Sequence, residues 1–307
     1  MLEFLIILKE IILPVFIVMI CGYVVQKKFS LDLSTIARVN IYLFVPSFIF
    51  VRLYSTDIPG TIFVNVMLFL LLYVIILYII SIFVARLTGF EKSKRVTFSN
   101  SIIFYNSGNY GVPVNDLVFR GDPFAMSIQV LVLMFQNIFL FSYGVFSLQS
   151  LDSGKLKALL GYFKMPVMYA MFFGLLFNWF DVPVSDVIWI PANYIADGMI
   201  ALALLMLGMQ VAQIKLTKGL GTVYVSLFIR LIVGPLIALV LIKLFGITGI
   251  LAQALLISSA MPTSVNSSVI AQEYKNHPEY AAQIVLFSTL LSAGTVSFFI
   301  YLARLLF

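Results

Sequence analysis

Ten stretches of about 20 mostly apolar residues follow one another along the chain, and they constrain its fold more than any other feature. A helix needs about 20 apolar residues to cross the hydrocarbon core of a bilayer, where a lipid-facing backbone must satisfy its own hydrogen bonds. Only 10% of the 307 residues are charged, whereas a soluble domain carries about 25%. The sequence therefore predicts an all-α integral membrane protein with ten transmembrane helices. The predicted spans cover residues 4–25, 36–54, 61–85, 96–119, 124–148, 165–180, 188–212, 220–245, 247–271 and 280–305.

Lysine and arginine are divided unequally between the two sets of alternate loops. One set holds most of them: Lys27, Lys28, Arg38, Arg86, Lys92, Lys94, Arg95, Lys155, Lys157, Lys164, Lys215, Lys218 and Lys275. The other set holds Lys9, Arg52, Arg120, Lys243 and Arg304. Because basic loops stay on the cytoplasmic side, we expect a multi-pass protein of the cell membrane with both termini outside the cytoplasm. Scattered basic clusters beside a bilayer account for the net charge of +6 without a nucleic-acid partner.

The stretch 149–164 divides the predicted spans into five and five. We predict a first repeat at 1–148, a short cytoplasmic connection at 149–164 and a second repeat at 165–307. Five is an odd number, so the two halves would enter the membrane in opposite directions, which is the topology of an inverted repeat. The fourth and ninth spans then correspond to each other.

Both of these spans carry a polar, helix-breaking segment near the middle, at residues 105–116 and 258–268. Pro113 and Pro262 each remove a backbone donor, and the glycines in the first segment permit conformations that expose amides and carbonyls. Irregular backbone at membrane depth survives only where it is buried in protein or lines a water-filled cavity. We therefore predict two crossing broken helices whose half-helix N-termini offer an anion site. The alternative is that these small residues only allow close helix packing.

Three charged residues lie well inside predicted spans, away from their ends: Arg230, Asp197 and Asp116. An unpaired charge at the bilayer centre costs at least about 2.5 kcal/mol, so Arg230 needs a partner, and either acid is a candidate. For Arg230 a structural ion pair or snorkelling and a substrate role both stay open, and the acids either pair or couple transport to protons. The second span is kinked by Pro46, a common feature of membrane helices.

Cys21 is the only cysteine and His277 the only histidine. A disulfide within one chain, a Cys/His metal site and a Cys-His nucleophile are therefore excluded. An intramembrane enzyme would need a nucleophile with a base, or paired carboxylates at depth. Neither acid in the spans lies in a recognised catalytic motif, so we predict neither an enzyme nor a cofactor.

Several motifs resemble the auxin efflux carrier family, which includes the plant PIN-formed carriers and bacterial malate or malonate permeases. The resemblance covers nearly the whole chain, and its most specific parts are residues 106–113, 230–235, 260–262 and 271–278. It implies a homodimer in which spans 1, 2, 6 and 7 form a scaffold and spans 3–5 and 8–10 a mobile transport domain. It also implies that Asn106 contacts the substrate carboxylate, as the corresponding plant asparagine does.

The chain departs from the plant carriers in two ways. Its central connection is short, and it lacks their Asp and Lys four residues apart near the start of the third span, so their ion-related support site is not predicted here.

These observations together predict a secondary carrier of small organic anions, such as malate, malonate or auxin-like acids, which works by alternating access of the elevator type. The predicted substrate site comprises Asn106, Ser107, Gly108, Tyr110, Pro113, Ser259, Pro262, Thr263 and Asn266. A receptor that binds a similar ligand without net transport stays open as an alternative. A channel is disfavoured by the alternating-access architecture.

Overall fold

The computed structural model describes residues 2–56, 58–144, 147–148, 166–214 and 221–307. Within these residues the regular elements are all helices, joined by turns and loops, and the one β-type pairing is an isolated bridge. Seven helical segments are long and apolar enough to cross a membrane. Three of them are the single helices α5 (Gly60–Leu87), α12 (Asp186–Gln213) and α17 (Pro278–Leu306). The other four combine helices with a π-helical turn: α1 (Leu2–Ile7), η1 and α2 (Leu13–Phe29); α3 (Leu33–Val39), η2 and α4 (Val45–Ser55); α8 (Pro123–Phe139) and η4 (Leu140–Gly144); and α13 (Gly221–Phe228), η5 and α14 (Gly234–Leu244). The seven segments coincide with predicted spans 1, 2, 3, 5, 7, 8 and 10.

The other three predicted spans are not single long helices. The fourth consists of α6 (Lys92–Ile103), the π-helical turn η3 (Ser107–Gly111) and α7 (Val112–Phe119). The ninth consists of α15 (Gly249–Ser259) and α16 (Val265–Glu273), and the sixth is the short apolar α11 (Pro166–Trp179). Both predicted helix breaks are therefore present. The connection predicted at 149–164 lies outside the described residues.

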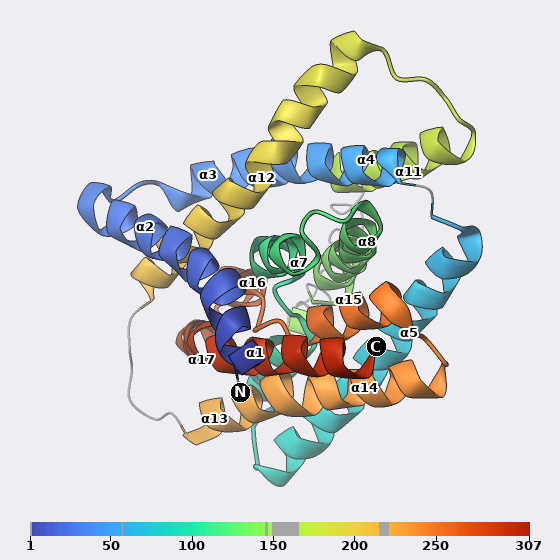
Figure 1. Ribbon diagram of the computed structural model, residues 1–307. Helices are drawn as coiled ribbons and strands as arrows, with labels where there is room; N and C mark the ends of the chain where they lie inside the picture. Colours follow the sequence, from blue (N-terminus) through green and yellow to red (C-terminus); the bar gives the residue numbers. More distant parts are fainter. Residues whose placement is uncertain (1, 57, 145–146, 149–165, 215–220) are drawn as a thin grey trace.

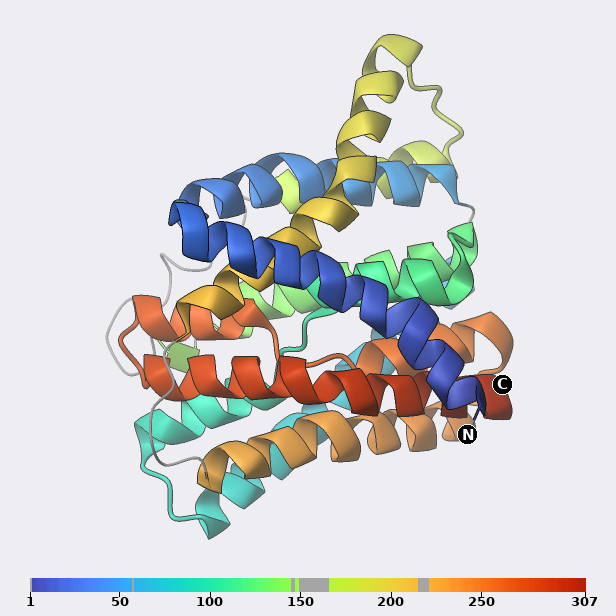
Figure 2. The same cartoon turned by 60° about the vertical axis from the view of Figure 1, so that its left-hand side comes forward.

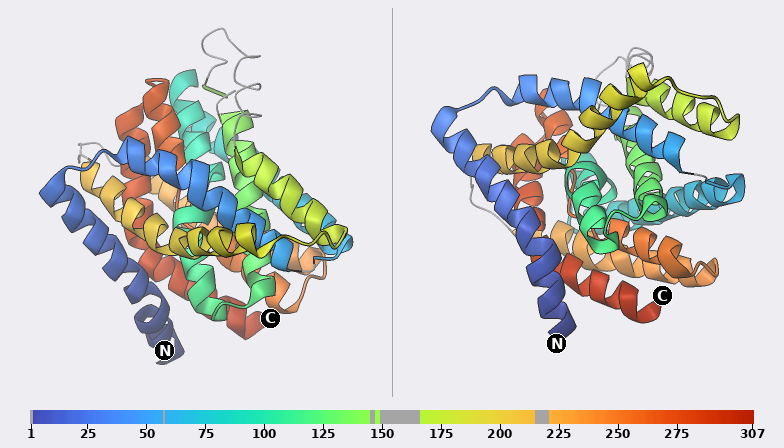
Figure 3. Two further views of the ribbon diagram at one scale, coloured as in Figure 1. Left: turned by 90° about the horizontal axis from the view of Figure 1, so that it is seen from above. Right: turned by 45° about the horizontal axis from the view of Figure 1, so that its top comes forward.

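The helices form two groups, and the second group contains the crossing of the two broken spans (Figure 1). Helices α2, α3, α4, α11 and α12 lie on one side, where α12 packs against both α2 and α4, and α11 packs against α4. We call these the peripheral helices. The two views in Figure 3 place α11 and α12 on the same side as α4.

The crossing group comprises α5–α8 and α13–α17. In Figure 2, α7 and α8 lie between the peripheral helices and the layer that contains α5, α13, α14 and α17. The two groups meet where α4 contacts α8 and where α12 contacts η3, and α1 reaches α17. Large apolar side chains such as Ile79, Phe83 and Leu244 are exposed on the outside, as expected of a surface that lies in lipid.

Two glycines allow α2 and α12 to approach closely. A Cβ atom built at Gly22 would lie 2.1 Å from the carbonyl oxygen of Leu205, and one at Gly208 would lie 1.8 Å from that of Met19. No side chain fits at either position. Close approach at glycine is a common way for helices to associate in lipid, where there is no hydrophobic force between them.

Four of the five π-helical turns precede a proline by two residues. The turns are η1 (Leu8–Ile12), η2 (Asn40–Phe44), η3 (Ser107–Gly111) and η5 (Ile229–Val233), and the prolines are Pro14, Pro46, Pro113 and Pro235. A proline ring clashes with the carbonyl four residues earlier and has no N–H to donate to it. A wider turn relieves the clash, and such π-turns frequently occur at functional sites.

Candidate functional site at the helix crossing

The two broken spans cross through extended segments that pair with each other. Tyr105 and Thr263 form an antiparallel bridge, in which the Asn106 amide donates to the Pro262 carbonyl at 2.8 Å. On the other side, the Ser264 amide donates to the Phe104 carbonyl at 2.9 Å. Buried backbone groups that have left a helix need such partners. Each broken segment therefore supplies hydrogen-bond partners for backbone groups of the other, and the crossing is an ordered part of the fold.

Polar side chains hold this crossing in place. The Thr263 hydroxyl donates to the Ser101 carbonyl at 2.9 Å. The Gln129 side chain donates to the Ser107 carbonyl at 2.7 Å and accepts from the Ser258 hydroxyl at 2.5 Å, so it joins α8 to both breaks. Gln136 lies about two turns further along the same face of α8, and its side chain accepts from the Tyr105 amide at 3.3 Å. Helix α8 is thus the support of the crossing.

Arg230 lies behind the crossing and is completely buried. Its guanidinium donates to the Ile102 carbonyl at 2.9 Å, to the Tyr73 hydroxyl at 2.7 Å and to the Ser259 carbonyl. Ile102 and Ser259 belong to the last turns of α6 and α15, whose carbonyls lack helical partners and carry the negative ends of the helix dipoles. One cation therefore neutralises the C-terminal ends of both leading half-helices.

This arrangement answers the question of a partner for Arg230. Among the described residues its partners are carbonyls and a phenol, and no carboxylate lies within salt-bridge distance; Asp197 instead lies 3.8 Å from Arg52. Asp116 is half-buried on α7 and interacts electrostatically with Arg52. The hypothesis that either acid pairs with Arg230 is therefore wrong in this structure. Within the described residues, no three acidic, histidine or cysteine side chains gather where a metal ion could bind.

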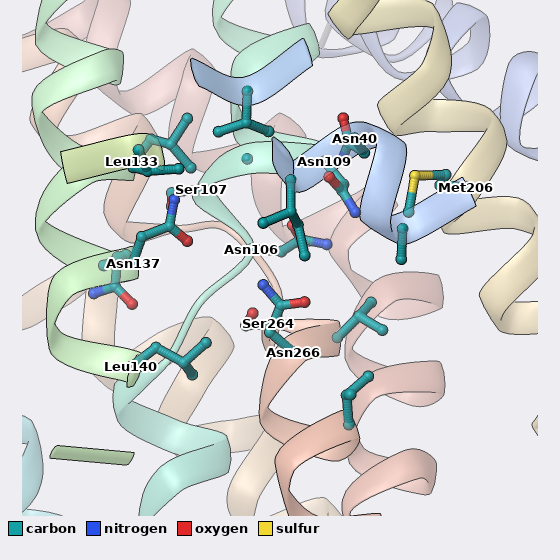
Figure 4. Close-up of a pocket in the computed structure, with 18 of the residues that line it drawn as sticks. Asn40, Asn106, Ser107, Asn109, Leu133, Asn137, Leu140, Met206, Ser264 and Asn266 are labelled. Atoms are coloured by element: carbon teal, nitrogen blue, oxygen red, sulfur yellow. The ribbon is translucent and has the colours of Figure 1, made fainter. Parts of the chain in front are cut away.

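A cavity of about 140 Å³ opens in front of the crossing, between the two helix groups. Its walls are the π-turn η2 and α12 from the peripheral helices, and η3, α8 and α16 from the crossing group. Figure 4 shows the amide groups of Asn40, Asn106, Asn109, Asn137 and Asn266 around this space. Among the residues that the structure describes, none that lines it is charged. The remaining lining residues are Ala37, Ile41, Val45, Tyr105, Ser107, Gly108, Leu133, Gln136, Leu140, Val167, Met199, Met206, Gln210, Ser264, Val265 and Val269.

Several lining amides lack a hydrogen-bond partner in the described structure. They include the side-chain nitrogens of Asn106 and Gln136 and the side-chain oxygens of Asn40 and Gln210. Asn106 is only 5% exposed and Asn40 only 3%, and an unsatisfied buried polar group costs about 1–3 kcal/mol. The half-helix N-termini at Ser107 and Val265 add backbone amides without helical acceptors. The empty cavity is therefore short of hydrogen-bond partners that a polar ligand can supply.

The structure places the predicted site residues in two layers. Asn106, Ser107, Gly108 and Asn266 line the cavity. The others lie in the crossing behind it: Tyr110 is buried and accepts from the Ser292 hydroxyl at 3.0 Å, and Pro113 is buried near the start of α7. Ser259, Pro262 and Thr263 make the crossing contacts described above.

Sequence reasoning missed the polar residues that other spans contribute. Asn40 comes from the second span, Gln136 and Asn137 from the fifth, and Gln210 from the seventh. A lone amide in a membrane helix also serves helix packing, so each was ambiguous by itself. The one usable signal was Pro46, because Asn40 begins the π-turn that precedes it.

Comparison with known proteins shows the family of the chain. A family model described as "Membrane transport protein" matches residues 7–158 and 153–300. The chain is a membrane transporter of the auxin efflux carrier family. The resemblance seen in its motifs is thereby confirmed.

Two relatives show the range of this family. An uncharacterized transporter of Methanothermobacter thermautotrophicus is 22% identical over 290 residues, which cover 92% of this chain and 94% of the relative. Auxin efflux carrier component 6 of Arabidopsis thaliana is 27% identical over 136 residues, which cover 42% of this chain but only 24% of the plant carrier. The transporter thus resembles the archaeal protein along its length and the plant carrier over part of it.

Proposed function

We propose that this transporter carries small organic anions, namely carboxylates of the size of malate, malonate or an auxin-like acid. The observation that carries the proposal is the cavity lined by neutral amides at the meeting point of two half-helix N-termini. Amide N–H groups donate charge-assisted hydrogen bonds to a carboxylate, and the positive ends of the helix dipoles favour an anion.

The size and neutrality of the cavity support a small, weakly held substrate. An engineered apolar cavity of about 150 Å³ binds benzene, so a volume of about 140 Å³ accommodates a single ring or a short acid. Without a cation in the lining, the carboxylate exchanges water for neutral donors only. A carrier needs such modest affinity, because its substrate must leave on the other side.

For the transport mechanism we propose alternating access. The cavity lies between the peripheral helices and the crossing group, so a movement of one group against the other would open it to each side in turn. The peripheral spans 1, 2, 6 and 7 would be the scaffold of a homodimer, and spans 3–5 and 8–10 the transport domain. The two groups would comprise ten spans in two inverted repeats, with both termini outside the cytoplasm.

The test is uptake of radiolabelled carboxylates by the purified protein in proteoliposomes, with imposed pH and voltage gradients. Asn106→Ala removes an unpartnered amide nitrogen from the cavity, so we expect weaker substrate binding, on the order of tenfold for one lost hydrogen bond to a charged group. Asn193→Ala is the matched control, because the Asn193 side chain donates within its own helix to the Trp189 carbonyl at 2.8 Å.

The same experiment separates the alternatives. A receptor would bind the carboxylate without net flux into the vesicles, and an enzyme would return a chemically altered compound. Equal uptake by the Asn106→Ala protein and the Asn193→Ala protein would remove Asn106 from the substrate site. Failure of every carboxylate in the panel to accumulate would remove the proposed substrate class.

A further inference from the structure

A second cavity, of about 410 Å³, lies away from the crossing and is strongly basic. Its charged lining residues are Arg86 at the end of α5 and Lys92 and Arg95 at the start of α6, and no acid among the described residues lines it. The remaining walls are Tyr78, Ile82, Val96, Ser99, Tyr143 and Ser147. We call this the basic pocket. Three cations facing one space repel each other unless an anion joins them.

The cations of the basic pocket have no carboxylate partner in the part of the chain that the structure describes. Among the described residues, no acid lies within 4.0 Å of Arg86, Lys92 or Arg95. The nearest acid in sequence, Glu91, is 3.1 Å from His277 instead. The Arg95 side chain is held through its Nε, which donates to the Phe90 carbonyl at 2.6 Å. Its two terminal nitrogens make no hydrogen bond to another described residue.

A buried hydroxyl supplies a second, independent observation. Ser99 is only 2% exposed, it lines the basic pocket, and its Oγ has no hydrogen-bond partner in the described structure. The Tyr78 and Tyr143 rings lie edge to face at 5.5 Å in the wall of the same pocket. The pocket therefore combines cations, an unpartnered hydroxyl and aromatic walls, which are the groups that hold a phosphate and the organic body attached to it.

We propose that the basic pocket binds a phosphate ester. Guanidinium groups match phosphate oxygens with two parallel hydrogen bonds, and the Ser99 hydroxyl gives a further donor. The pocket lies at the loop between the third and fourth spans, on the side of the membrane that is rich in lysine and arginine. Tyrosine is enriched at this depth, and anionic headgroups collect there. The occupant is the headgroup of an anionic phospholipid or a soluble phosphate compound.

Occupancy of this site would reach the transport machinery through α6. Ser99 precedes Asn100, whose side chain donates to the Ser147 hydroxyl at 3.1 Å, and α6 then continues to the helix break at Phe104. A phosphate that ties α5 to α6 therefore acts on the helix that leads into the crossing. The site nevertheless stands apart from the substrate cavity, since the two cavities share no lining residue.

The test uses the full chain in nanodiscs and measures binding directly. One arm compares phosphatidylcholine discs with and without phosphatidylglycerol and counts retained lipids by native mass spectrometry. The other arm titrates inorganic phosphate and measures its binding by calorimetry. We expect the wild type to retain phosphatidylglycerol, to bind phosphate, or both. The R86Q/K92Q/R95Q protein should bind the same probe at least about tenfold more weakly.

The matched control is K27Q/K28Q/R38Q, which removes the same charge from the same side of the membrane at residues that do not line the pocket. It should bind like the wild type. Ser99→Ala keeps every charge and should still weaken binding several-fold, whereas Ser93→Ala should not. Retained lipid alone identifies a headgroup site, and phosphate binding alone identifies a soluble ligand. Equal weakening by both triple variants, or no binding of either probe by the wild type, would overturn the proposal.

Discussion

Replacing Arg230 by methionine tests whether one buried cation holds the crossing together. Methionine keeps an unbranched side chain of similar length, but it removes the donors to Ile102, Tyr73 and Ser259. Hydrogen bonds to a charged group are each worth about 1.5–3 kcal/mol, so three of them amount to roughly 4–9 kcal/mol. Loss of a charge from the membrane interior returns at least about 2.5 kcal/mol.

The net expectation for Arg230→Met is a destabilisation of roughly 2–6 kcal/mol. Tyr73 moves the value toward the lower limit, because its hydroxyl lies 3.3 Å from the Ser259 carbonyl and still donates to it without the arginine. The Ile102 carbonyl has no such replacement donor among the described residues, so it loses its hydrogen bond outright. The measurement is thermal and denaturant unfolding of the purified protein in detergent.

Two further variants distinguish charge from hydrogen bonding. Arg230→Lys keeps the charge but loses the planar contact with the Tyr105 ring, whose centroid lies 4.9 Å from the guanidinium carbon. Arg230→Gln keeps donors but not the charge. We expect Lys to preserve more stability than Gln, because two helix dipole ends face the group. Arg304→Met is the control, since that arginine is exposed at the end of α17. Equal stability of the Arg230→Met and Arg304→Met proteins would refute the reasoning.

Three other predictions concern packing, charge and the cavity. Gly208→Ala should destabilise the protein by at least about 1–3 kcal/mol, because the new Cβ meets a backbone carbonyl of the first span. Gly294→Ala, whose Cβ meets nothing within 4 Å, should be neutral or stabilising by up to about 1 kcal/mol. Unfolding in detergent compares the two variants. Asp197→Asn should change the free energy of unfolding by no more than about 1 kcal/mol, because its partner Arg52 is 3.8 Å away and the acid is 70% exposed. An altered pH dependence of uptake in this variant would instead assign Asp197 to proton coupling. Gln136→Met should lower both stability and carboxylate affinity, measured by unfolding and by uptake, since this side chain supports the crossing and lines the cavity.

The sequence predicts the long helices and the two breaks because both depend on local chemistry. A run of apolar residues in lipid has few alternatives to a helix, and Pro113 or Pro262 among small polar residues weakens a helix wherever it lies. Seven long segments and both breaks appear where the pattern placed them. The motifs at the breaks, together with residues 230–235 and 271–278, also indicated the family.

The composition of the cavity was less predictable, because it depends on which faces of distant helices meet. Asn40 and Gln210 lie 170 positions apart along the chain yet line one space. The partner of Arg230 was mispredicted for a related reason. Charge alone suggests an acid as the partner of a buried cation. The fold instead offers Arg230 the C-terminal carbonyls of two broken helices, which carry only the partial negative charge of the helix dipole.

Gln136 links substrate binding to the shape of the crossing. Its side-chain oxygen accepts from the Tyr105 amide, while its nitrogen is unpartnered at the cavity. A carboxylate that accepts from this nitrogen polarises the amide and strengthens the bond on its other side, because hydrogen bonds in a chain reinforce one another. The occupied cavity would therefore hold the crossing more tightly than the empty one. Since the empty site leaves several amides unsatisfied, binding of the proposed carboxylate would favour a closed arrangement of the two helix groups, as the proposed alternating access requires.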